Sequence, residues 1–263
     1  LPTCGFTPDG DYPMIAAEKG LLQFRLFCKN ESSVQLWGGS AYNMVPDQCQ
    51  CIVRADLEKA EVLKTVGFSE GQRQKKLTAK GKSAHSSRAD EGENAICKMC
   101  EMLYQAGVQT EAVRFVAEMV GEDCYAEKIF GICEDEHSGK LTFNIGRIEA
   151  NQNGQTIEVD IRFPVSKKKD DLVAAIQKAA ERYHLMYHEV DYVKPLYVSE
   201  KHPLIRTLRK IYEEETGLDG TPISSGGATY ARVFENFVAF GPRFPEREQM
   251  AHQADEYIRI DDL

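Results

Sequence analysis

The sequence predicts a protein of two parts: an α+β unit in the middle of the chain and part of an α/β layer towards its C-terminal end. Three observations carry this prediction. Apolar and polar residues alternate as in strands along Leu21–Arg54, a pair of strands joined by a turn follows at residues 141–163, and a glycine-rich turn near residue 226 leads into a short helix. Hairpins mixed with helices are typical of an α+β unit, whereas the strand, turn and helix that follow are typical of an α/β layer.

The elements before residue 121 are predicted from periodicity. After a loop at Leu1–Pro13, apolar residues occupy every second position from Leu22 to Cys28, which is the period of a strand. Lys75–Ser83 is expected to form another strand. Two helical patterns follow, at about Glu93–Ala106 and Gln109–Val120.

The clearest hairpin pairs Leu141–Glu149 with Gln155–Phe163, because Asn151–Gly154 between them has the residues of a tight turn. Asp170–His184 is amphipathic and is expected to form a helix, followed by a strand at Tyr187–Val198.

A further helix is expected to begin at Pro203 and to end at about Thr216, where Gly217 stops it. Beyond it, the sequence predicts a glycine-rich turn, a short helix, an apolar strand and a loop, in that order (Ser224–Thr229, Tyr230–Phe234, Val238–Phe240 and Met250–Tyr257).

Composition and charge exclude several classes of protein. The 263 residues are 42% hydrophobic and 28% charged, which is typical of a globular chain rather than a disordered one. Lys plus Arg total 32 against 41 Asp plus Glu, so the net charge of −9 opposes binding to nucleic acid or to a membrane surface. The longest apolar runs are far shorter than the roughly 20 residues of a membrane helix. The chain shows no signal peptide and does not begin with Met, so we expect its N-terminus to have been cut.

The eight cysteines are interpreted as reduced structural thiols, which is consistent with a cytoplasmic protein. Cys97 and Cys100 have the spacing of half a zinc ribbon, but they lie in a predicted helix and no second pair stands at zinc-finger spacing. Cys49 and Cys51 alternate along a predicted strand, where cysteine behaves as a small apolar residue.

Three local features have residue types that suit catalysis or binding. His252 lies in a loop after an apolar strand and is flanked by Asp255 and Glu256; it is a metal ligand or general base, or else a partly exposed histidine without a role. The turn at Gly226 and Gly227 leaves backbone N–H groups accessible to an anion, although a plain tight turn is an equally good interpretation. His85 directly follows a predicted strand and, judged locally, is simply a solvated loop residue.

Other polar features are interpreted as structural. His184 and His188 are four residues apart, but the pattern changes from helix to strand between them. Glu213–Glu215 is a solvated face of a helix, and His137 lies in a polar loop.

Taken together, the segments resemble PepV-type dipeptidases, the dipeptidase branch of the aminoacylase and carboxypeptidase family of two-metal hydrolases. Eight motifs occur in the family's order and span essentially the whole chain. They are Leu1–Pro13 with Glu18–Gly20, Tyr42–Asp47, Gly81–His85, Asn144–Gly146, Ile161–Pro164, Gly226–Arg232, Val238–Gly241 and His252–Tyr257.

The resemblance implies a role for each matching residue. Asp9 matches a carboxylate ligand of one zinc ion, and His252 matches the imidazole ligand of the other. Asn43 and His85 match lid residues that polarise the scissile carbonyl and stabilise the oxyanion. Arg162 matches a group that holds the terminal carboxylate of a dipeptide or short peptide, as do the amides of Gly226 and Gly227. The metal is expected to be zinc, with manganese or cobalt as alternatives.

The resemblance also implies a domain plan and a monomer. A partial α/β catalytic domain of the zinc-exopeptidase type would comprise residues 1–19 and 199–263, and an inserted α+β lid domain would comprise residues 20–198. In relatives that dimerise, the partner supplies the imidazole that corresponds to His85, whereas enlarged PepV-type lids supply it from the same chain.

Several family motifs have no match in this sequence. It contains no His-x-Asp motif, no bridging aspartate, no Glu-Glu pair in the corresponding place and no last helix. We therefore expect a fragment that does not hydrolyse dipeptides by itself. Two alternatives stay open: a non-catalytic descendant that binds peptides or amino acids through Arg162, Asn43 and the glycine turn, and a purely structural or oligomerising module.

Overall fold

A computed structural model describes residues 2–54, 74–248, 250 and 254–262. They form two compact units, which are described separately. Unit 1 comprises residues 1–20, 135–139 and 193–263, and unit 2 comprises residues 21–134 and 140–192. Both contain mixtures of sheet and helix, as expected of a chain of α/β and α+β parts.

Unit 2 is built on a seven-stranded sheet in the order β12-β4-β11-β10-β5-β6-β7. Its long hairpin pairs β10 with β11 in antiparallel register, from Thr142↔Arg162 to Asn151↔Gly154. The strands from β10 through β5 and β6 to β7 are antiparallel neighbours as well. The strands are β4 (Gly20–Cys28), β5 (Gln35–Gly38), β6 (Gln48–Arg54), β7 (Gln74–Lys80), β10 (Thr142–Asn151), β11 (Gly154–Phe163) and β12 (Met186–Val193).

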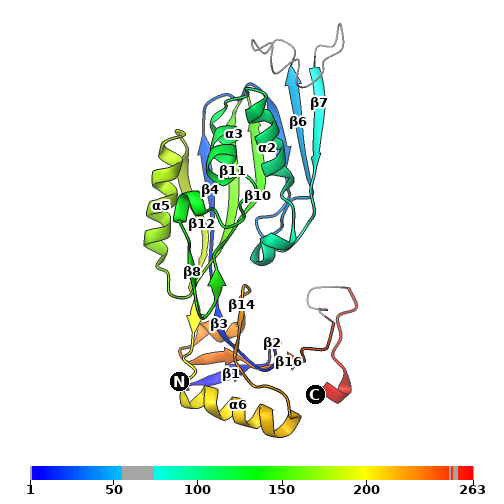
Figure 1. Ribbon diagram of the computed structural model, residues 1–263, viewed down its shortest axis with the longest axis vertical. Coiled ribbons are helices and arrows are strands. Elements are labelled where there is room, and N and C mark those ends of the chain that lie inside the picture. Colours follow the sequence, from blue (N-terminus) through cyan, green and yellow to red (C-terminus); the bar gives the residue numbers. More distant parts are fainter. Residues whose placement is uncertain (1, 55–73, 249, 251–253, 263) are drawn as a thin grey trace. The chain divides into compact units, whose positions relative to one another are not determined.

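Helices cover one face of this sheet. Helix α2 (Ala95–Gln105) packs against β6, β7 and β10, and α3 (Glu111–Phe115) packs against β11 (Figure 1). Helix α3 continues as a π-helical turn, η2 (Val116–Val120), so the helical pattern predicted there is confirmed as two pieces. The shorter elements are η1 (Ser86–Glu91), α4 (Glu127–Phe130), β8 (Glu134–Asp135) and β9 (Gly139–Lys140), and α5 (Lys169–Glu181) completes the set.

The buried residues of unit 2 match the hydrophobic periodicity of the sequence. In β4, alternate residues from Leu22 to Cys28 are buried, as the sequence predicts for a strand with one face against helices. The largest fully buried side chains there include Phe24, Phe115 and Phe163. Helix α2 begins where Asn94 accepts from the N–H groups of Ile96 and Cys97, at 3.0 and 3.3 Å, which satisfies two of the N–H groups that a helix start leaves unpaired.

Unit 1 contains a mixed sheet in the order β1-β15-β3-β13, with β14 also paired to β3. Strand β1 (Gly5–Thr7) is parallel to β15 (Phe237–Ala239), and β14 (Ile223–Ser225) is parallel to β3 (Ile15–Glu18). Helix α6 (Pro203–Thr216) packs Ile205 and Leu208 into the unit's apolar core. The remaining elements are β2 (Gly10–Asp11), β13 (Leu196–Tyr197), η3 (Tyr230–Val233), β16 (Pro242–Arg243) and η4 (Ile260–Asp262).

Two expectations about elements were wrong. Leu1–Pro13 is not only loop, because β1 and β2 pair with strands more than 200 residues away in the sequence, where no local pattern reveals the partner. The strand expected at Tyr187–Val198 is broken into β12 and β13, which belong to different sheets. Pro195 lies between them, and a proline has no N–H group to donate to a sheet.

All eight cysteines lie within the described residues, and none forms a disulfide. Burial raises the pKa of the Cys49, Cys51 and Cys97 thiols to about 12. Cys4, by contrast, is exposed. None of the helices in the described ranges has both the length and the apolar character that crossing a membrane requires.

The buried thiols predict a loss of stability at alkaline pH. In the unfolded chain a thiol loses its proton near its ordinary value of 9.0, whereas burial holds the proton on folded Cys51 up to about pH 12. The folded state therefore binds more protons between these values, and each such thiol lowers the free energy of unfolding by up to about 1.4 kcal/mol per pH unit there. Urea unfolding at pH 8, 9 and 10 should show the decline.

Cys51→Ala should make that decline shallower by one thiol, although it lowers stability at every pH by opening the core. Cys4→Ala is the matched control and should leave the slope unchanged. Equal slopes for wild type and Cys51→Ala would contradict the prediction.

Candidate functional site

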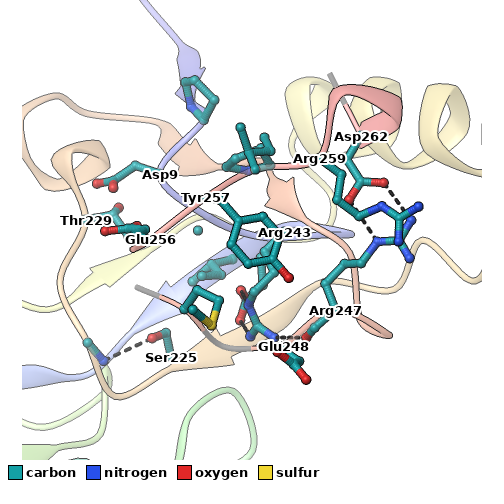
Figure 2. Close-up of a pocket in the computed structure, with 18 of the residues that line it drawn as sticks. Asp9, Ser225, Thr229, Arg243, Arg247, Glu248, Glu256, Tyr257, Arg259 and Asp262 are labelled. Atoms are coloured by element: carbon teal, nitrogen blue, oxygen red, sulfur yellow. Dashed lines mark hydrogen bonds and ion pairs between the residues drawn. The ribbon is translucent and has the colours of Figure 1, made fainter. Parts of the chain in front are cut away.

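A cavity of about 810 Å³ lies within unit 1. Its lining comes from three parts of the chain: the loop after β1, which includes Asp9; the turn after β14, at residues 227–229; and residues near the C-terminal end, within 242–248, at 250 and within 256–262. Figure 2 shows the Asp9, Thr229 and Glu256 side chains grouped on one side of this cavity. The structure thus brings together Asp9 and the glycine turn, which are more than 200 residues apart in the sequence.

Asp9 is positioned by the short strands on either side of it. Strand β1 ends at Thr7, and β2 begins at Gly10, where a Cβ atom would lie 2.8 Å from Cδ1 of Ile15. Asp9 is exposed, and its Oδ2 accepts a hydrogen bond from the Tyr230 N–H at 3.1 Å. The carboxylate is therefore tied to the start of η3 while it borders the cavity.

The glycine turn differs in one respect from a simple row of accessible amides. The Gly227 N–H donates to Oγ of Ser225 at 3.0 Å, so its donor is already engaged. The next N–H, that of Ala228, has no hydrogen-bond partner among the described residues, and Ala228 is exposed at the cavity. Sequence reasoning placed the anion donors at Gly226 and Gly227 and did not single out Ala228.

A buried charge pair lies beneath this turn. Glu18, at the end of β3, is fully buried, and the Arg232 side chain is 9% exposed. The Arg232 Nε donates to Oε2 of Glu18, and Thr229 donates to the same carboxylate through its N–H at 3.2 Å and its hydroxyl at 2.5 Å. Both charged residues belong to motifs of the sequence, but neither motif alone indicates a role for them.

Two further arginine–aspartate pairs hold the C-terminal side of the cavity. Arg243 donates to both carboxylate oxygens of Asp11 at 2.7 Å, and Arg247 donates to those of Asp262 at 2.7 and 2.8 Å. The guanidinium of Arg247 lowers the pKa of Asp262, and the carboxylate raises the pKa of Arg247 in return. The first pair connects β16 to β2, and the second connects the loop after β16 to η4.

His252 lies outside the described residues, so its expected role as a metal ligand stays a prediction. Glu256, four residues later, does line the cavity. Within the described ranges, no three His, Cys, Asp or Glu side chains are close enough together to hold a metal ion.

In unit 2, the structure brings Asn43 and His85 side by side. The N–H of Ser86 donates to the carbonyl oxygen of Asn43 at 2.9 Å, and Met44 forms a β-bridge with His85. The buried Asn144 fixes this loop, since its amide donates to the carbonyl oxygens of Tyr42 and Met44 at 2.8 and 2.9 Å. The sequence analysis names Asn144 only as part of a motif. A polar residue at a strand position that faces the core is a signal that could have identified its structural role.

The hydrogen bonds of His85 determine which ring nitrogen carries the proton. Its Nδ1 accepts from the backbone N–H of Ser87 at 3.2 Å and lies 2.8 Å from the Ser87 hydroxyl. A backbone N–H can only donate, so Nδ1 is the unprotonated nitrogen of a neutral ring and Nε2 carries the proton. The single N–H group of this ring is therefore the one at Nε2.

Arg162 lies on β11 and is nearly buried, with 6% of its side chain exposed. Its Nε and Nη2 donate to Oδ1 and Oδ2 of Asp160 at 2.7 and 3.1 Å, and Gln23 donates to Oδ2 of the same carboxylate at 2.8 Å. The guanidinium is therefore held in a fixed plane. Arg162, Asn43 and His85 lie in unit 2, whereas Asp9 and the glycine turn lie in unit 1; that all five serve one site stays a prediction.

The chain is similar to known proteins along its whole length. The peptidase dimerisation domain of the M20 family matches residues 70–188. A putative dipeptidase of Bacillus subtilis, YtjP, is 35% identical over 288 residues, which cover 100% of this chain and 61% of that relative. The chain is therefore similar to peptidases of the M20 family. Its expected resemblance to the PepV-type dipeptidases of that family is confirmed.

Two other proteins are similar to this chain over a comparable share of their own length. The β-Ala-Xaa dipeptidase of Lactobacillus delbrueckii is 26% identical over 283 residues, covering 100% of this chain and 60% of its own length. The solved aminoacylhistidine dipeptidase of Vibrio alginolyticus aligns with a TM-score of 0.46 and 11% identity, covering 92% of this chain and 59% of that one. The chain thus spans about three fifths of the length of the curated relatives it matches.

The Asp160–Arg162 pair generates a stability prediction. Asp160→Asn keeps the shape of the side chain but removes the negative charge that Arg162 contacts with two hydrogen bonds, and breaking a buried pair in this way should cost about 3–5 kcal/mol in the free energy of unfolding. Glu149→Gln, which breaks the half-exposed pair with Arg147 in the same sheet, is the control and should cost about 1 kcal/mol or less. Urea unfolding measures both values, and a cost for Asp160→Asn as small as the control's would show that this pair does not need both charges.

Proposed function

We propose that this chain forms part of a metal-dependent dipeptidase, contributing an inserted lid (residues 20–198) and part of a catalytic domain (residues 1–19 and 199–263). The observation that supports this most is the cavity of unit 1, where Asp9 and the Gly226–Thr229 turn meet although the sequence separates them widely. The putative and established dipeptidases among its relatives support a dipeptide as the substrate.

The metal site is proposed on Asp9 and His252. One oxygen of the Asp9 carboxylate accepts from Tyr230, and the exposed side chain leaves the other oxygen for a cation, so a carboxylate and an imidazole suit zinc, manganese or cobalt. A bound ion of this kind lowers the pKa of a water molecule and so supplies a nucleophile near neutral pH. Stable metal sites have three or four protein ligands, so we expect residues other than Asp9 and His252 to supply further ligands.

His85 and Asn43 are proposed to stabilise the oxyanion. The neutral ring of His85 presents a protonated Nε2, and the Asn43 side chain is exposed on the neighbouring loop. Donors of this kind contribute most when they meet charge that develops only in the transition state.

Arg162 and the glycine turn are proposed to hold the terminal carboxylate of the substrate. A planar guanidinium suits a carboxylate, and Asp160 fixes its plane in advance. At the turn, the Ala228 N–H is the donor that the described contacts leave for such a group.

The oligomeric state and the cellular location are part of the same proposal. We expect a monomer, in which His85 serves the same chain. A cytoplasmic location is supported by the eight cysteines, none of which is disulfide-bonded.

The 263-residue polypeptide alone should not hydrolyse dipeptides, because its sequence has no match for the family's His-x-Asp motif or for the Glu-Glu pair that would supply the general base. We expect activity when the chain is preceded by the segment of the Bacillus subtilis relative that it does not match. The assay uses alanyl-alanine and β-alanyl-alanine with zinc, manganese or cobalt, and EDTA should abolish turnover. Turnover by the 263-residue chain alone would contradict the proposed incompleteness, and a completed protein that binds metal without hydrolysing either dipeptide would contradict the proposed function.

In the completed protein, His85→Ala should lower kcat about 10²–10³-fold, the usual cost of removing one oxyanion donor. The effect on KM should be small, since the donor acts mainly in the transition state. His188→Ala removes an exposed imidazole from the same unit and is the matched control, with kcat unchanged. A His85→Ala enzyme with wild-type kcat would exclude the proposed role.

A further inference from the structure

Arg232 donates hydrogen bonds to three separate segments of unit 1, at Glu18 and Lys19, at Lys194 and at Gly227. Besides the Nε contact to Glu18, its Nη1 donates to the carbonyl oxygen of Lys194 at 2.7 Å. Its Nη2 donates to the carbonyl oxygens of Lys19 and Gly227, at 2.6 and 2.8 Å. Only the planar fork of a guanidinium reaches all of these acceptors at once, since a lysine ammonium is a single point of charge.

The turn itself also bonds Glu18. Its carboxylate accepts from both donors of Thr229, and Thr229 Oγ1 in turn accepts from the Ala231 N–H at 3.2 Å at the start of η3. The N–H of Tyr230, the residue directly after Thr229, donates to Asp9. Glu18 and Asp9 therefore bond two consecutive residues of the chain, Thr229 and Tyr230.

The pairing of β14 with β3 is made by backbone groups rather than by this network. Backbone pairing fixes the register of β14 on β3, at Ile223↔Ile15, Ser224↔Ala17 and Ser225↔Glu18. The apolar core of the unit is built from other residues, among them Met14, Leu208 and Val238. What the charge pair adds is a fixed conformation for the turn at 226–229, which has no apolar side chain in that core.

We propose that Glu18 and Arg232 are positioning residues: they hold the Ala228 N–H and Asp9 in place for the substrate carboxylate and the metal ion. The inference rests on the proposed function, because it requires that the turn binds a carboxylate. Neither residue touches the substrate; each acts through the turn that it holds.

The test uses the 263-residue chain labelled with ¹⁵N and titrated with glycylglycine while the backbone amide signals are followed by NMR. In the wild type, the Ala228 amide should shift with saturation. Arg232→Lys, which keeps the charge but not the fork, should weaken glycylglycine binding at least tenfold. Thr229→Val removes only the hydroxyl that bonds Glu18 and should weaken binding similarly, whereas Thr229→Ser keeps that hydroxyl and should restore it.

Leu208→Ala is the control for stability, because it opens the core of the same unit without touching the turn. It should lower the melting temperature while binding stays within twofold of wild type. Unchanged binding in both Arg232→Lys and Thr229→Val, with a normal wild-type titration, would overturn the positioning role alone. Absence of any Ala228 shift in the wild type would contradict the proposed carboxylate site and overturn this inference with it.

Discussion

Glu18 and Arg232 carry opposite charges into a part of unit 1 from which water is excluded, and the geometry of the candidate site depends on their contact. Removing such groups from water costs several kcal/mol per ion, which their mutual attraction offsets only if the remaining donors and acceptors are also satisfied. Here they are satisfied by Thr229 on one side and by backbone carbonyl groups on the other. A buried pair of this kind adds little net stability, but it permits few other arrangements of the turn.

The same principle operates in unit 2, where polar networks fix segments that the apolar core cannot specify. Asp160 and Gln23 hold the plane of Arg162, and Asn144 holds the loop that carries Asn43. Side chains that must meet a substrate in one orientation are better held by hydrogen bonds than by apolar contacts, since hydrogen bonds are directional. In both units, the candidate residues are thus held in position by buried polar neighbours.

The sequence was sufficient for elements whose hydrophobic period is strong. The alternation in β4, the turn chemistry between β10 and β11, and the Pro203 and Gly217 limits of α6 are local signals, and the structure agrees with them. It was insufficient for β1 and β2, because two- and three-residue strands have no period of their own and form only against distant partners.

The candidate site was predictable to a similar degree. Asp9 and the glycine turn were found through their motifs, and the structure places them on one cavity. Glu18 and Arg232 gave no signal as a pair, since 214 positions separate them and only folding makes them neighbours. The engagement of the Gly227 N–H by Ser225 likewise depends on the conformation of the turn rather than on its composition.

Native-state hydrogen exchange at Thr229 and Tyr230 tests most directly whether buried charge fixes the turn. Both amides lie at the start of a short 3₁₀ helix, and their protection comes from the Glu18 and Asp9 carboxylates rather than from helical hydrogen bonds. We predict that both amides exchange far more slowly than an unstructured peptide and that Glu18→Gln accelerates the exchange of both while amides in α6 keep their rates. Rapid exchange at both positions in the wild-type chain, with α6 protected, would contradict it.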